Sequence, residues 1–183
     1  MTAGFRQSDE QVVFEAGRGI TFNELTLITP DGREVKRQAI RHPGAVAVVP
    51  MVDEEHAMLV RQYRAPFDAE VLEIPAGLRD VAGEDPADTA ARELAEEIGY
   101  RAGSLELLTV FWNAVGLSDE STHVYLGTDL TAGAHDRHGP EEQAMEMVIV
   151  SLHDVPAMIA NGDLRDAKSI IGLLMASERF SRD

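Results

Sequence analysis

Three glutamates, Glu93, Glu96 and Glu97, carry the clearest chemical signal in this sequence. Residues three and four positions apart share one face of a helix, so in a helix these carboxylates converge. Such like charges repel each other by about 0.2–0.5 kcal/mol per pair in water. Mg²⁺ prefers oxygen ligands and works on phosphate substrates, and it would remove this repulsion. The spacing favours a metal site, and a solvated acidic helix face is the alternative that it leaves open.

The residues around the glutamates predict where this helix begins and ends. Asp85 can accept hydrogen bonds from the first turn, and Pro86 suits the first helical position. Gly99 is a typical helix stop. Arg92 precedes Glu96 by one helical turn and is expected to hold its carboxylate. Five apolar residues at helical spacing are expected to form the buried face, with the glutamates outside it: Ala87, Ala90, Ala91, Leu94 and Ile98.

The segment before the helix completes a longer motif. A strand-like run, VLEIP, leads into Ala76-Gly77 and a loop from Leu78 to Gly83. Here the chain resembles the Nudix hydrolases, whose motif is Gly, five residues, Glu, seven residues, Arg-Glu, an aliphatic residue, any residue, Glu-Glu, any residue, Gly and an aliphatic residue. The fixed positions are filled by Gly77, Glu84, Arg92, Glu93, Leu94, Glu96, Glu97 and Gly99. Two departures occur: six residues separate Gly77 from Glu84, and Tyr100 replaces the last aliphatic residue.

The resemblance implies hydrolysis of a diphosphate with Mg²⁺, or with Mn²⁺ in its place. Divalent metals neutralise the charge that protects a pyrophosphate linkage, orient the phosphates and acidify a bound water. The helix half of the motif matches at every fixed position, so the inserted residue is expected to bulge the loop without moving the metal-binding face. The implied metal ligands are the side chains of Glu93, Glu96 and Glu97 and the backbone carbonyl of Ala76.

A further carboxylate is needed to position or deprotonate the attacking water. Glu142 is the first candidate and Glu141 the second, with a solvated loop as the alternative for both. Together with Glu97 and Arg92 they form the predicted catalytic set. The polar segment from Gly133 to Pro140, which precedes them, is typical of a lid that closes on substrate.

Features outside the motif resemble the ADP-ribose pyrophosphatase branch. They are the RQYR segment, the run from Glu73 to Gly77, the GLSDE segment at residues 116–120 and the late Glu-Glu pair. Val115 stands where that branch has proline. The predicted substrate contacts are Arg61, Arg64, Glu73, Ser118 and Glu120. For Glu73, a contact with a ribose or adenine edge and simple exposure at a strand end both stay open.

This resemblance implies cleavage of ADP-ribose, or a related nucleoside diphosphate sugar, to AMP and a sugar phosphate. One alternative stays within the enzyme class: hydrolysis of another nucleoside diphosphate derivative, such as a dinucleoside polyphosphate. The other is a non-catalytic module that only binds a nucleotide. The complete set of motif glutamates disfavours this last reading.

The remaining sequence predicts the elements that position these residues. Strand patterns at 11–15, 20–29 and 35–41 suggest a small antiparallel piece. The apolar run AVAVVPMV predicts a buried strand with MLVRQYR as its partner, and three further strand-like runs follow the acidic helix. Near the C-terminus, the sequence predicts helices at Leu152–Asn161 and Ala167–Phe180.

Mixed strands with helices on both sides predict an α/β fold. The resemblance implies a Nudix α/β/α sandwich with a mixed sheet, in a domain of residues 43–183. Residues 1–42 are expected to form an N-terminal β extension, and they resemble strands that the ADP-ribose pyrophosphatase branch uses for homodimer formation.

Composition limits the partners. The formal net charge of −16 repels nucleic acid and anionic membranes, so neither is expected as a partner. A phosphate-handling site on such a chain needs metal ions and local arginines. The 183 residues contain no cysteine, no apolar run long enough to span a membrane and no signal-like N-terminus, which predicts a cytoplasmic protein.

Overall fold

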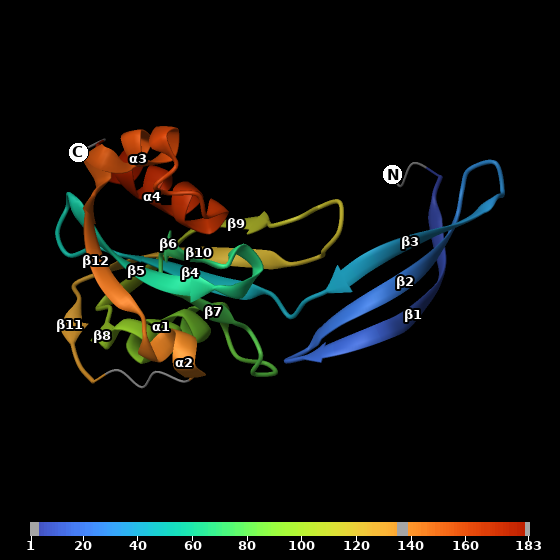
Figure 1. The fold of residues 1–183 in the computed structure, drawn as a ribbon, viewed down its shortest axis with the longest axis horizontal. Helices are drawn as coiled ribbons and strands as arrows, with labels where there is room; N and C mark the ends of the chain where they lie inside the picture. The colour runs from blue at the N-terminus through green and yellow to red at the C-terminus, as the bar shows by residue number, and fades with distance from the viewer. Residues whose placement is uncertain (1–3, 135–138, 182–183) are drawn as a thin grey trace. The chain divides into compact units, whose positions relative to one another are not determined.

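The computed structural model describes residues 4–134 and 139–181 (Figure 1). The chain divides into two compact units. The first is Met1–Gly44 with Phe111–Ser121, and the second is Ala45–Val110 with Thr122–Asp183. The first unit therefore includes a segment from within the predicted 43–183 domain.

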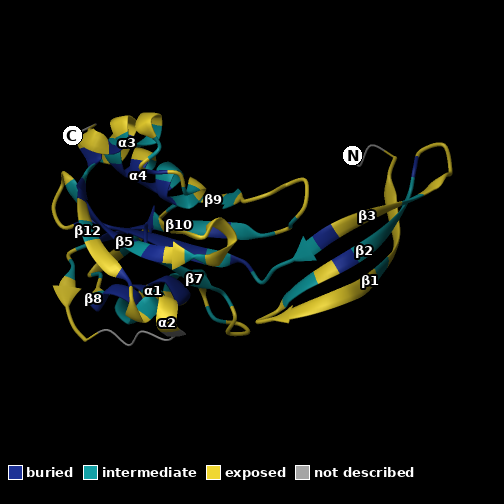
Figure 2. Ribbon diagram, in the orientation of Figure 1, coloured by how far each residue is buried: buried dark blue, intermediate teal, exposed yellow. Residues whose placement is uncertain are grey.

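The first unit contains a three-stranded antiparallel sheet in the order β1-β2-β3. Its strands are β1 (Arg6–Gly17), β2 (Ile20–Ile28) and β3 (Glu34–Arg41), which confirms the antiparallel piece expected from the sequence. β1 is exposed along almost all of its length, as its yellow colour shows (Figure 2). Three of its consecutive apolar residues, Val12, Val13 and Phe14, are more than half exposed.

The second unit is built on two main sheets. One has the order β7-β4-β10-β9 and the other the order β12-β5-β6, and a two-stranded pair β11-β8 is separate. The strands are β4 (Ala45–Pro50), β5 (His56–Arg64), β6 (Ala69–Glu73), β7 (Ala76–Leu78), β8 (Tyr100–Arg101), β9 (Ser104–Trp112), β10 (Ser121–Thr128), β11 (Thr131–Ala132) and β12 (Glu146–Ser151).

Helices cover both sides of these sheets. α1 (Pro86–Ile98) and α4 (Ala167–Phe180) both contact β4, and they lie on opposite sides of it (Figure 1). The shorter helices are α2 (Gly139–Gln143), α3 (Val155–Asn161), and the 3₁₀ turns η1 (Ala65–Phe67) and η2 (Leu152–Asp154). This layering confirms the predicted α/β sandwich with mixed strands. Among the described residues, no helix is long and apolar enough to cross a membrane.

The hydrophobic core beneath α1 fixes that helix on the sheets. Leu94 and Ala90 of α1 are fully buried against Val46 and Val48 of β4, and Val60 of β5 closes the same cluster. Burying a side chain such as leucine or valine contributes about 1.5–3 kcal/mol, so this packing holds α1 firmly in place.

One detail of the expected fold is wrong. β4 and β5 are not partners in one sheet, because β7 and β10 already occupy both edges of β4. An isolated bridge joins Met51, directly after β4, to Ala57 of β5. The helical pattern at Leu152–Asn161 is confirmed, as the 3₁₀ turn η2 followed directly by α3, and α4 also has the bounds that were expected.

Candidate functional site

The ends of α1 form as the sequence predicts. The side chain of Asp85 accepts a hydrogen bond from the Ala87 N–H at 2.9 Å, and Pro86 takes the first turn. Gly99 ends the helix in the left-handed conformation, with φ 72°, which a glycine adopts without steric cost. These two caps fix which residues of α1 face the sheet and which face the neighbouring loop.

The buried face of α1 differs from the expected one, because Thr89 and Glu97 belong to it and Ala87 is only half-buried. Ala91 is exposed, whereas Glu97 is only 5% exposed and lies within the protein. Glu97 is buried because the chain entering β7 lies over this part of the helix, where the Ala76 N–H donates to the Glu97 carboxylate at 3.1 Å. The third glutamate of the motif is thus held beside the backbone of Ala76.

Gly77 leaves the space that the Glu93 carboxyl group occupies. A Cβ atom built on Gly77 would lie 2.0 Å from Cδ of Glu93 and 2.2 and 2.4 Å from its two oxygens. No side chain fits there, because atoms in ordinary contact are 3.4–4 Å apart. The motif glycine is therefore needed for close approach of β7 to the carboxylate, not for a positive φ.

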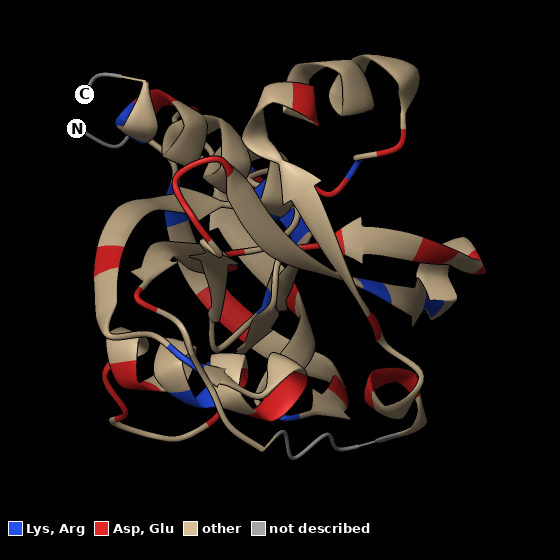
Figure 3. Ribbon diagram, turned by 90° about the vertical axis from the view of Figure 1, so that its left-hand side faces the viewer, with Lys and Arg blue, Asp and Glu red and all other residues tan. Residues whose placement is uncertain are grey.

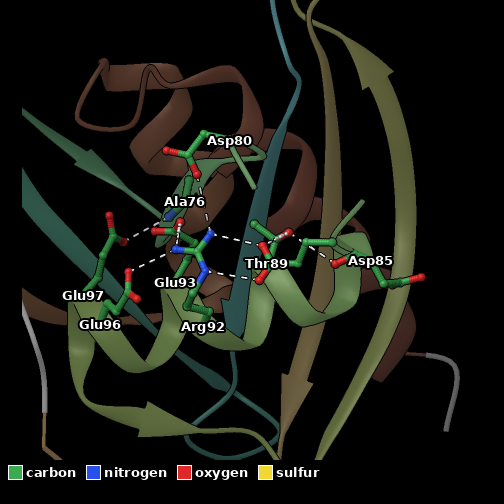
Figure 4. Close-up of polar contacts among 9 residues, drawn as sticks. Ala76, Asp80, Asp85, Thr89, Arg92, Glu93, Glu96 and Glu97 are labelled. Carbon is green, nitrogen blue, oxygen red and sulfur yellow. Dashed lines mark hydrogen bonds and ion pairs between the residues drawn. The ribbon is translucent and has the colours of Figure 1, made fainter. Parts of the chain in front are cut away.

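Arg92 gathers acidic side chains from the helix and the preceding loop (Figure 4). Its Nη1 donates to Glu93 at 2.7 Å and to Glu96 at 3.2 Å, which confirms the predicted contact with Glu96. Its Nη2 donates to Glu84 at 3.3 Å and lies 3.9 Å from Asp80. One guanidinium therefore neutralises part of the negative charge that converges on this face.

Burial makes the remaining negative charge costly. Burial, together with the nearby charges of Glu93 and Glu142, raises the pKa of Glu97 to about 8, and the hydrogen bond from Ala76 opposes this rise. Burial also raises the pKa of Glu93, with Arg92 opposing it. These carboxylates therefore favour a bound cation or a bound proton.

The donor atoms fit a hard divalent cation. Carboxylate oxygens of Glu93, Glu96 and Glu97 and the carbonyl of Ala76 are the ligand types that Mg²⁺ and Mn²⁺ take. Within residues 4–134 and 139–181, no group of three acidic or histidine side chains is arranged to bind a metal ion. Arg92 holds Glu93 and Glu96 here, so these two must exchange that contact for a metal.

The structure brings Glu142 toward this cluster. Both Glu141 and Glu142 lie on α2, which contacts β5, and the charge of Glu142 acts on Glu97. Glu141 is exposed, whereas Glu142 is half-buried. Part of the expected lid, residues 135–138, lies outside the described residues.

Arg64 and Glu73 form a two-pronged ion pair beside the cluster. Nε and Nη2 of Arg64 donate to the two oxygens of Glu73 at 2.6 and 2.8 Å. Glu73 is 2% exposed, so the expectation that it simply faces water is wrong. Lys168 of α4 also donates to Glu73, a contact that the sequence does not signal because 95 positions separate the two residues.

This ion pair lines a pocket of about 580 Å³ between the β5–β6 segment and the α3–α4 turn. Arg61 lines it too, together with Phe67 and Arg165. The predicted substrate residues Arg61, Arg64 and Glu73 therefore share one pocket. Basic residues are scarce on this chain, where acidic segments outnumber basic ones (Figure 3), so their concentration here is a marked local feature.

Ser118 and Glu120 lie in the first unit, in the segment 111–121. The Ser118 hydroxyl accepts a hydrogen bond from the Glu120 N–H at 3.1 Å. Glu120 also lies 4.0 Å from the ring of His42. The contact between Ser118 and Glu120 orders the backbone of the loop in which both residues stand.

The comparisons with known proteins agree with this geometry. A family model described as NUDIX domain matches residues 41–171. The chain is 39% identical to an ADP-ribose pyrophosphatase of Bacillus subtilis (strain 168), over 76% of this chain and 75% of that protein. It is 34% identical to a methanol dehydrogenase activator of Bacillus methanolicus, over 86% and 85% of the two chains.

A solved structure described as an ADP compounds hydrolase has the same fold. The two structures superpose with a TM-score of 0.85 over 97% of this chain and 95% of the other, at 24% sequence identity. This likeness confirms the predicted fold class.

Proposed function

The chain belongs to the Nudix family, and from this premise we propose that it is a metal-dependent pyrophosphohydrolase that cleaves ADP-ribose to AMP and ribose 5-phosphate. The single observation that carries the proposal is the arrangement on α1. The Glu97 carboxylate accepts from the Ala76 N–H, and the Glu93 carboxyl group occupies the space that Gly77 leaves. Arg92 joins Glu96 to Glu93 on the same helix.

The proposed metal ligands are Glu93, Glu96, Glu97 and the carbonyl oxygen of Ala76, and Mg²⁺ is the proposed cation, with Mn²⁺ as a substitute. When bound, the cation supplies the positive charge that a diphosphate needs and acidifies a water. The raised pKa of Glu97 supports this assignment, because a cation offsets the cost of its buried charge. Arg92 then releases Glu93 and Glu96 to the cation and keeps its contacts to the loop carboxylates Glu84 and Asp80.

Glu142 is the proposed base for the attacking water, with Glu141 as the second candidate. The half-buried position of Glu142 and its electrostatic effect on Glu97 support this choice. A carboxylate here would hold the proton that the water gives up while the water attacks phosphorus.

Arg64 is the proposed contact for the diphosphate, and Arg61 lines the same pocket. Two nitrogens of Arg64 bind Glu73, so the orientation of the guanidinium is set before substrate arrives. Ser118 and Glu120 are proposed to contact the sugar or the nucleoside.

The proposed assembly is a homodimer that uses the N-terminal extension. The exposed apolar run Val12, Val13 and Phe14 on β1 supports this, because a second copy would bury it. Light scattering after size exclusion tests the proposal: the wild type is expected at twice the 20.0 kDa chain mass, and Phe14→Glu is expected to shift it toward the monomer. A monomeric wild type would contradict the proposal.

The absence of cysteine from the sequence supports a cytoplasmic location.

A second candidate stays in the same enzyme class. Val115 stands where ADP-ribose pyrophosphatases have proline, and this favours another nucleoside diphosphate derivative as the substrate. A panel of ADP-ribose, ADP-glucose and a dinucleoside polyphosphate separates the two. The leading proposal requires the highest kcat/KM for ADP-ribose, and equal values across the panel would count against it.

A further inference from the structure

The first turn of α4 is tied to the segment that leads to Ala76. Asp166 caps the helix, and its carboxylate accepts from the Ser169 N–H at 3.0 Å and from the Ser169 hydroxyl at 2.5 Å. The Ser169 oxygen in turn accepts from the Ile74 N–H at 2.8 Å. Ser169 is fully buried, so this contact fixes the start of α4 against the residue after Glu73.

Lys168 extends the same turn to the side chain of Glu73. It donates to one Glu73 oxygen, the one that also accepts from Nη2 of Arg64, and it lies 3.0 Å from Asp166. Exposure falls from 40% for the Arg64 side chain to 13% for Lys168 and 3% for Glu73. The carboxylate is therefore enclosed, with a cation on each side.

Two cations stabilise the charge of the Glu73 carboxylate. Burial disfavours the charge on Glu73, yet the hydrogen bonds of Arg64 and the charge of Lys168 outweigh it and lower the pKa of Glu73. Removing one partner of a buried ion pair leaves charge without compensation. A Glu73 without Lys168 would then turn, take up water or bind a proton, and each change breaks the two-pronged contact that sets the plane of Arg64.

Arg64 links this ion pair to the carboxylate cluster. Its positive charge acts on Glu97, and the charge of Glu97 acts on Arg64 in return. The path of contacts thus runs from Lys168 through Glu73 to Arg64, and the charge of Arg64 acts on Glu97, the residue that is buried beside Ala76.

We propose that Lys168 is a positioning residue that acts through Glu73 to hold Arg64 in the orientation that receives the substrate diphosphate. The proposal rests on the proposed function at one point, the contact of Arg64 with the diphosphate. The hold of Lys168 on Glu73 and Arg64 does not depend on it.

Kinetics of Lys168→Met test the proposal against a matched control, Arg165→Met. Arg165→Met removes the same charge from the same pocket, and the hydrogen bond of Arg165 goes to the Gly162 carbonyl of its own turn, not to Glu73. Lys168→Met is expected to raise KM about tenfold with a smaller change in kcat, while Arg165→Met changes KM less than about threefold. Lys168→Arg is expected to restore KM toward the wild-type value. Equal KM changes in the two Met variants would overturn the proposal.

A double-mutant cycle shows whether Lys168 acts through Arg64. If it does, Lys168→Met adds little to the defect of Arg64→Met, because the residue that it positions is already gone. Fully additive effects on kcat/KM in the double variant would contradict the inferred path.

A spectroscopic measurement works even if ADP-ribose is not the substrate. The Nε–H signal of Arg64 is expected to be sharp and slow to exchange in the wild type, because Nε donates to a buried oxygen at 2.6 Å. Lys168→Met is expected to broaden this signal. Ser169→Ala is expected to lower Tm without changing the signal. If Lys168→Met loses this signal but the wild type does not hydrolyse ADP-ribose, the proposed function is rejected and the positioning role of Lys168 stands. An unchanged signal in a folded Lys168→Met would reject the positioning role.

Discussion

Replacing Gly77 with alanine tests the geometry of the site without removing any charged group. The added Cβ would lie 2.0 Å from Cδ of Glu93, whereas ordinary contacts are 3.4–4 Å, so the carboxyl group must withdraw by more than about 1 Å. Misplacing a catalytic group by about 1 Å can lower the rate about 100-fold, which corresponds to about 2.7 kcal/mol of transition-state stabilisation.

Stability should change far less than activity. The φ of Gly77 lies outside the left-handed region, so alanine brings no backbone strain. The Glu93 side chain is 14% exposed and ends in a carboxyl group that can turn toward the loop. The free energy of unfolding is therefore expected to fall by no more than about 1–2 kcal/mol.

The assay compares kcat/KM for ADP-ribose, metal affinity by calorimetry and urea unfolding. Gly77→Ala should lose about 100-fold in kcat/KM and bind Mg²⁺ more weakly, while it stays folded. In this background the shorter side chain of Glu93→Asp should cost less activity than the same change costs in the wild type, because it relieves the contact. A Gly77→Ala enzyme with wild-type kcat/KM, or one that is inactive only because it unfolds, would refute the reasoning.

Three further predictions concern charge. Burial raises the pKa of Glu97 to about 8, above its ordinary value of 4.5, so its contribution to stability is complete below about pH 4.5 and is lost as the pH rises through 8. Urea unfolding of metal-free protein should therefore show a decline above pH 5 that is smaller in Glu97→Gln, and parallel curves would contradict this. Because a cation must displace the Glu97 proton, Mg²⁺ should bind more tightly at pH 8 than at pH 6 and should release a proton on binding. Calorimetry in two buffers measures both effects. A Mg²⁺ affinity that does not change with pH would argue against Glu97 as a ligand. The hydrogen bonds of Arg41 lower the pKa of Glu10 to about 2. The carboxyl carbon of Glu10 should therefore show an NMR titration midpoint well below 4, and Arg41→Met should move this midpoint toward 4.5. An ordinary midpoint in the wild type would count against the ion pair.

Features that depend on nearby residues could be predicted from the sequence. The caps of α1 at Asp85 and Gly99 form within one turn of the helix, and α4 has the bounds that its apolar spacing predicts. The contact of Arg92 with Glu96 also follows from helical spacing alone. Each of these needs only the chain within a few residues to decide it.

Features that depend on distant parts of the chain could not be predicted in this way. The edges of β4 are taken by strands that lie far along the chain, and nothing in its sequence excludes β5. Glu97 is polar, so its burial becomes visible only when the backbone of Ala76 is placed over α1. The contact of Lys168 with Glu73 likewise depends on how α4 docks, and the sequence pattern between them carries no sign of it.

Product analysis of ADP-ribose by ³¹P NMR tests the central claim most directly. With Mg²⁺ the wild type is expected to give equal amounts of AMP and ribose 5-phosphate, and a chelator should stop the reaction. A folded Glu97→Gln enzyme should be slower by at least about 100-fold. A wild type that forms no AMP with either Mg²⁺ or Mn²⁺, or a Glu97→Gln enzyme that turns over at the wild-type rate, would contradict the proposed function.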